Sequence, residues 1–153
     1  MSTSITEARN KAGSYFKEGY NCAESIFLTF SEYFANEISS DAVKLFTGFG
    51  GGVGEAGCMC GALTGSIAIL GMLEGRTSNK ESRLNAYKVS NEFHNKFRDK
   101  FSGTCCRVLS RGKEFGSKEH STNCLKITGN TAKMLMEFIE EKDLIKSVER
   151  SKA

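Results

Sequence analysis

Apolar residues along this chain recur mostly three or four positions apart, which is the spacing of a helix with one buried face. No proline interrupts this pattern. The chain is therefore predicted to be all-α. Its 153 residues fit a single domain spanning residues 1–153, a bundle of about five or six helices.

The first half of the chain is predicted to contain two helices and a shorter one. A capping box of Ser4 and Glu7 opens a helix over residues 5–18, which ends at Gly19. Asn21, followed by Glu24, caps a second helix that runs to about residue 35, with Cys22 in its first turn. A short helix covers residues 42–46. The apolar face of the second helix consists of Ala23, Phe27, Phe30 and Phe34.

Residues 59–73 are apolar on every side, which predicts a helix buried at the centre of the bundle. Gly and Ala are frequent in it, and Gly61 and Gly65 lie four positions apart, as in helices that approach one another closely. The bundle is therefore expected to form around this Gly/Ala-rich helix.

A second capping box, Ser78 and Glu81, predicts a long helix over residues 79–101. A short helical turn over 105–109 and a polar loop over 110–123 follow. The last helix is expected to begin at Cys124, capped by Thr122 or Asn123, with a charged tail after Asp143. Two apolar faces are expected to join the core, Leu84, Tyr87, Phe93, Phe97 and Phe101 on the long helix and Ala132, Leu135, Met136 and Ile139 on the last.

Charge and hydropathy exclude two classes of partner. The formal net charge is only +3 and the basic residues are spread along the chain, so nucleic-acid binding is not expected. The longest apolar run, residues 62–73, is too short to cross a bilayer, and the first residues contain no apolar signal segment. We expect a cytoplasmic protein that contacts no membrane.

The chemistry of this chain is expected to reside in its cysteines. In a reducing compartment, six cysteines indicate metal binding or redox chemistry more than a disulfide framework. Predicted helix starts carry several of them, where the helix dipole and free N–H groups stabilise thiolates. Four separate segments could thus bring a thiolate to one centre, as an iron–sulfur cluster requires. The six are Cys22, Cys58, Cys60, Cys105, Cys106 and Cys124.

The glycine-rich run that precedes Cys60 is expected to wrap such a centre, because glycine lets the backbone approach a ligand closely. Its candidate cofactor-binding residues are Gly50, Gly51, Gly52, Gly57 and Gly61. Residues 52–57 also match G-x-G-x-x-G. Without a preceding strand and a βαβ unit, that match does not indicate dinucleotide binding.

Cysteine spacing alone leaves three functions open. Neither the ferredoxin runs nor paired C-x2-C zinc motifs occur. The chain could bind an iron–sulfur cluster and transfer electrons. It could be a dithiol/disulfide enzyme that uses Cys105-Cys106 or Cys58 with Cys60. It could also be a structural module that holds zinc. His120, four residues before Cys124, is a further candidate ligand.

The segment Cys60-Gly61-Ala62-Leu63-Thr64-Gly65 resembles the CGAxxG signature of a family of redox-active proteins named for the cysteine order C…CGAxxG…C…C. The resemblance covers roughly residues 8–138, with GYNCAES at its first cysteine and FSGTCCRVL at its third. It implies a redox or cluster-ligand set with an unidentified redox partner protein and a possible homodimer. That set is Cys22, Cys60, Cys106 and Cys124.

The family also resembles the split-Soret cytochromes, which pair haem with an iron–sulfur centre. No C-x-x-C-H occurs in this chain, so covalent haem is not expected. Cys58 and Cys105 are additional to the family pattern. These two cysteines could be spare thiols or alternative ligands, or Cys105 could form a vicinal disulfide with Cys106.

Overall fold

The computed structural model describes residues 3–34 and 38–145, and these fold into an all-helical domain. Five of the helices described are 13 residues or longer: α1 (Thr3–Lys17), α2 (Cys22–Phe34), α5 (Gly61–Glu74), α6 (Leu84–Phe101) and α8 (Lys118–Glu141). Between them lie the short segments η1 (Ser40–Val43), α3 (Lys44–Thr47), α4 (Gly50–Val53) and α7 (Cys106–Leu109). The described ranges contain no strand, so the predicted fold class is confirmed.

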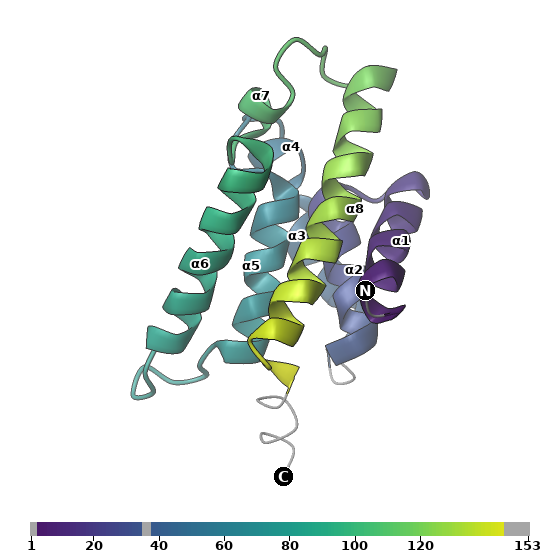
Figure 1. The fold of residues 1–153 in the computed structure, drawn as a ribbon. Coiled ribbons are helices and arrows are strands. Elements are labelled where there is room, and N and C mark those ends of the chain that lie inside the picture. Colours follow the sequence, from purple (N-terminus) through teal and green to yellow (C-terminus); the bar gives the residue numbers. More distant parts are fainter. Residues whose placement is uncertain (1–2, 35–37, 146–153) are drawn as a thin grey trace.

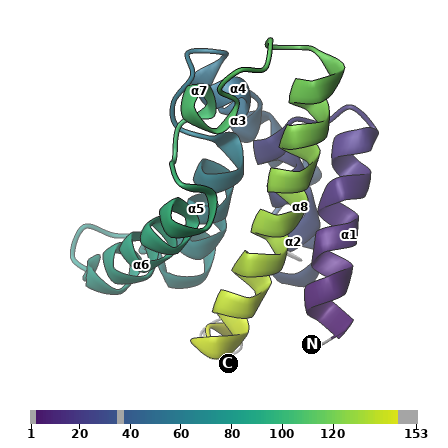
Figure 2. The same cartoon turned by 45° about the horizontal axis from the view of Figure 1, so that its top comes forward.

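The long helices form a bundle in which α8 packs along α1 and α5 packs against α2, α6 and α8 (Figure 1). One end of the bundle gathers α4, α7 and the loop that leads into α8 (Figures 1 and 2). In the described part of the chain, no helix is both long enough and apolar enough to cross a membrane.

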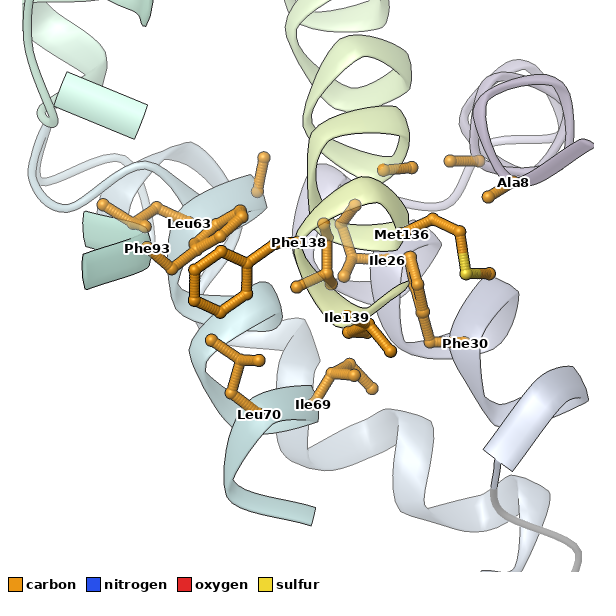
Figure 3. Close-up of a cluster of buried hydrophobic side chains, with 14 of the residues drawn as sticks. Ala8, Ile26, Phe30, Leu63, Ile69, Leu70, Phe93, Met136, Phe138 and Ile139 are labelled. Atoms are coloured by element: carbon orange, nitrogen blue, oxygen red, sulfur yellow. The ribbon is translucent and has the colours of Figure 1, made fainter. Parts of the chain in front are cut away.

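The core lies where α5 meets the helices around it (Figure 3). Leu63, Ile69 and Leu70 of α5 are almost fully buried. Phe93 of α6 and Phe138 of α8 meet edge to face, with ring centroids 5.6 Å apart. Such aromatic pairs add to the free energy gained by burying apolar area. The buried central helix predicted from residues 59–73 is therefore confirmed.

Two glycines set the separation of α5 from α2. A methyl group placed on Gly65 would lie 3.1 Å from the carbonyl oxygen of Ala23 and 3.3 Å from the Cβ of Ile26. One placed on Gly61 would collide with the sulfur of Cys22. The four-residue glycine spacing thus marks a close helix–helix contact, as predicted.

Three predicted helix starts are wrong. Ser4 lies inside α1, and its hydroxyl donates to Glu140 Oε1 at 2.6 Å. The residues before α6 form turns, held by Arg76 Nη1 donating to the carbonyl oxygen of Glu81, so α6 begins at Leu84 and not at 79.

The third wrong start concerns α8, which begins at Lys118, six residues before Cys124. Ser117 caps it by accepting a hydrogen bond from the His120 N–H at 3.1 Å. Its first turns are polar because they extend beyond the apolar core, so their sequence has the composition of a loop.

The stripe predicted on the long helix is buried only in part. Phe93 and Phe97 are fully buried and Phe101 is partly buried, whereas Leu84 and Tyr87 are 72% and 62% exposed. These two lie in the first turn of α6, ahead of its first buried residue, Val89. The tail predicted after Asp143 falls mostly outside the described residues.

The contact between α5 and α2 predicts a difference between two glycine substitutions in one helix. Gly65→Val forces branched methyl groups into backbone of α2 and should lower the free energy of unfolding by about 1–3 kcal/mol. Gly71→Val is the matched control, because nothing lies within 4 Å of a methyl group at Gly71. It should stay within about 0.5 kcal/mol of the parent. Urea unfolding followed by circular dichroism measures both, and equal destabilisation would contradict the proposed contact.

Candidate functional site

All four cysteines of the predicted ligand set line one cavity of about 360 Å³. Its lining includes residues of α4, α7 and the first half of α8, and these elements meet at one end of the bundle (Figure 2). Cys22 is the first residue of α2, Cys60 directly precedes α5, and Cys106 is the first residue of α7. Cys124 lies in the second turn of α8 and not at a helix start as predicted.

The capping box of Asn21 and Glu24 fixes the start of α2 and hence Cys22. The Glu24 N–H donates to Asn21 Oδ1 at 2.9 Å, and the Asn21 N–H donates to Glu24 Oε1 at 3.0 Å. The Asn21 side chain also donates to the carbonyl oxygen of Thr47 at 3.0 Å. These bonds satisfy helix N–H groups and attach the first turn of α2 to α3.

Cys60 and Cys106 are brought together by two chain segments that lie side by side. The Cys60 N–H donates to the carbonyl oxygen of Thr104 at 2.8 Å, and the Arg107 N–H donates to that of Gly57 at 3.0 Å. A disulfide between Cys58 and Cys105 joins the same segments. The vicinal Cys105-Cys106 disulfide left open by the sequence is therefore not the bond that forms.

Three of the candidate cofactor-binding glycines lie close to the sulfurs of Cys22 and Cys106. Backbone N–H groups of Gly51 and Gly61 hydrogen-bond the sulfurs of Cys22 and Cys106 respectively. Gly52 has a φ of +69°, and a methyl group on it would collide with the Cys58 nitrogen and lie 3.2 Å from the Cys106 sulfur. Only glycine fits such a position.

The other two candidate glycines lie farther from the cavity. Gly50 packs against the side chain of Asn21, which a methyl group there would overlap. Gly57 accepts the hydrogen bond from Arg107 and so helps to align the two cysteine segments.

Three of the thiols share hydrogen bonds, with Cys60 in the middle. Hydrogen bonding to Cys60 lowers the pKa of Cys22 to about 7 against the opposing effect of burial, and it lowers the pKa of Cys106 as well. Hydrogen bonds to Cys106 and Cys22, together with burial, raise the pKa of Cys60 well above its ordinary value. This trio therefore favours the thiolate form of the two outer cysteines and the protonated form of Cys60.

Cys124 has a different environment from the trio. Burial raises the pKa of its thiol to about 11, with smaller contributions from the charges of Cys22 and Cys106. Nε2 of His120 lies 3.5 Å from its sulfur. Because Nδ1 of His120 accepts the Gly116 N–H at 3.4 Å, a neutral ring carries its proton on Nε2 and donates it to Cys124. His120 is buried in the first turn of α8 and not in a polar loop.

Several residues that line the cavity were not among the predicted site residues. Thr128 of α8 lines the cavity and is fully buried, and its hydroxyl has no hydrogen-bond partner among the described residues. An unpaired buried hydroxyl is costly, so its place in a cavity wall suits a ligand. Ser110 hydrogen-bonds Cys124. The apolar walls are Phe16, Tyr20, Leu109, Phe115 and Ile127.

The four cysteines surround this cavity without converging on a point. Within residues 3–34 and 38–145, no three His, Cys, Asp or Glu side chains form a group that could hold one metal ion. A tetrahedral zinc site places every ligand sulfur about 2.3 Å from one centre. The arrangement in the structure is therefore more open than a closed zinc site.

Comparison with known proteins places this geometry in context. An "Uncharacterized protein" from Archaeoglobus fulgidus is 22% identical over 143 residues, which are 88% of this chain and 95% of that protein. No solved structure matches the chain. Residues 20–138 match the family described as "Putative redox-active protein (C_GCAxxG_C_C)", and this stretch contains all six cysteines. The chain belongs to this redox-active family.

Proposed function

We propose that the chain is a small electron-transfer protein and that its cavity holds an iron–sulfur centre bound by Cys22, Cys60, Cys106 and Cys124. The observation that carries the proposal is that these four thiols, from four separate elements, line one cavity. Membership of a redox-active family supports it.

The donor groups present fit such a centre. Thiolates are the ligands of iron–sulfur clusters, and hydrogen bonds to sulfur are one of the factors that set their potential. Such bonds already reach the sulfurs of Cys22 and Cys106 from Gly51 and Gly61. The open spacing of the four cysteines favours a cluster of several metal ions over one zinc ion, since a cluster keeps its ligands farther apart.

Each part of the site has a defined task in this proposal. The thiol trio and Cys124 of α8 would hold the centre. The apolar walls limit the access of water to the sulfurs, which makes the hydrogen bonds to sulfur stronger. A bound cluster supplies reversible one-electron transfer to a redox partner protein.

Metal analysis of the intact protein tests this directly. Protein produced and purified without oxygen should be brown and contain iron and acid-labile sulfide in comparable amounts. Elemental analysis and an absorption spectrum measure this. Colourless protein with stoichiometric zinc would instead assign the four thiols to a structural metal site, and metal-free protein would refute a metal centre altogether.

Serine substitution identifies the ligands. Cys22→Ser, Cys60→Ser, Cys106→Ser and Cys124→Ser should each lower bound iron at least about tenfold, because loss of even an outer-shell partner costs about that much metal affinity. The double variant Cys58→Ser with Cys105→Ser is the control, since it leaves all four ligands in place and should keep most of the iron. Iron content per folded protein measures both, and the converse pattern would overturn the ligand set.

A substitution of His120 tests whether this residue binds the metal centre or only donates a hydrogen bond to Cys124. We expect His120→Gln to keep the iron and to move the reduction potential, because the substitution changes a hydrogen bond to the Cys124 sulfur and leaves the four thiols in place. Iron analysis together with potentiometric titration measures both effects. Loss of iron from this variant would make His120 a ligand.

A further inference from the structure

Each cysteine of the Cys58–Cys105 disulfide lies close in sequence to a free thiol of the cavity. One residue separates Cys58 from Cys60, and Cys105 directly precedes Cys106. Cys60 and Cys106 are both free. Cys58 and Cys105 are partly exposed, so molecules from solution can reach the bond. Access and neighbouring thiols are two conditions for thiol–disulfide exchange.

This disulfide is not needed to align the segments it joins. The hydrogen bonds from Cys60 to Thr104 and from Arg107 to Gly57 hold the same two segments, one on each side of the disulfide. Opening the bond therefore leaves the register of the segments defined. A bond that can open without unfolding its surroundings is suited to a redox cycle.

A second cavity, of about 430 Å³, is lined in part by residues of these segments, and its basic side chains outnumber its acidic ones. Its lining includes Gly57 and Cys106, the sequence neighbours of the two bonded cysteines, and shares Cys106 with the thiol cavity. Three basic side chains line it, Arg107, Arg111 and Lys113, against the single carboxylate of Glu55. None of these three basic groups forms a salt bridge with a described residue. Such a surface attracts an anion.

We infer that Cys58 and Cys105 form a redox-active pair that exchanges with an anionic disulfide bound in this basic cavity. Two electrons and two protons from a dithiol reductant convert the Cys58–Cys105 bond to two thiols. One of them, as thiolate, attacks the substrate disulfide, forms a mixed disulfide and releases one substrate thiol. The other attacks the protein sulfur of the mixed disulfide, releases the second substrate thiol and restores the bond.

This inference is independent of the proposed metal centre. It uses the two cysteines outside the predicted ligand set, and its readout is the state of one disulfide. Metal-free protein can therefore give a positive result here, and iron-loaded protein can give a negative one.

The first measurement is a redox equilibrium. The full chain is equilibrated without oxygen in mixtures of reduced and oxidised glutathione, alkylated and mapped by mass spectrometry. Cys58–Cys105 should change from bonded to reduced as the proportion of reduced glutathione rises. A purely structural bond would stay oxidised even in about a hundredfold excess of reduced glutathione, and that result would overturn the inference.

The second measurement tests the anionic substrate. Re-formation of Cys58–Cys105 in the reduced protein should be at least about tenfold faster with oxidised glutathione, an anion, than with cystamine, a dication, at low ionic strength. Adding salt should remove most of this difference. Equal rates would overturn the assignment of the basic cavity.

Substitution of charged residues tests whether the basic cavity causes the preference for oxidised glutathione over cystamine. Arg107→Gln with Arg111→Gln should abolish the preference for oxidised glutathione, whereas Lys80→Gln, on the exposed turn before α6, should keep it. In the single variants Cys58→Ser and Cys105→Ser, the exchange reaction should stop at a mixed disulfide between glutathione and the remaining cysteine. The variant that forms this adduct identifies the attacking thiol. Absence of an adduct from both single variants would refute the exchange step.

Discussion

The candidate site depends on the close approach of α5 to α2. Gly65 lets the α5 backbone lie against Ala23, and Gly61 leaves room for the Cys22 sulfur at the first turn of α5. Any side chain at Gly61 would push Cys22 away from Cys60. The conformational entropy lost by fixing glycines in a helix is thus offset by a contact that defines both the core and the site.

This contact also brings Cys22 and Cys60 close enough to share a hydrogen bond. Hydrogen bonds from Cys60 and from backbone N–H groups lower the pKa values of Cys22 and Cys106, which favours their thiolate forms at one end of the bundle. Cys124 faces these two cysteines from α8, whose long contact is with α1. A metal centre bound there would hold these two parts of the bundle together, so we expect its binding free energy to add to folding stability.

Much of the fold could be predicted from the spacing of apolar residues, because helix periodicity is a local signal. The buried central helix followed directly from it, and the cap of α2 followed from the residue types of Asn21 and Glu24. The start of α8 could not be predicted, because its first six residues are polar, as in a loop. Nothing in the sequence indicates that this helix extends beyond the apolar core of the bundle. Leu84 and Tyr87 fit the stripe by spacing, but the position of α5 decides which turns of α6 are covered.

Part of the site could also be predicted from the sequence. The resemblance to the family identified the four cysteines that line the cavity, whereas cysteine spacing alone indicated only thiol chemistry. Pairing of Cys58 with Cys105, the buried hydroxyl of Thr128 and the basic cavity beside Arg107 all depend on contacts between segments distant in sequence. Such contacts leave no periodic trace in the residues themselves.

The bond between Cys58 and Cys105 also has a topological effect. It joins residues 47 positions apart and closes a covalent ring that contains α5 and α6. In the chain-entropy account, a ring of that size restricts the denatured chain by about 4 kcal/mol at 25 °C. The oxidation state of two sulfur atoms would thus set the unfolding temperature of the central helix, and with it the temperature at which the whole bundle loses its core.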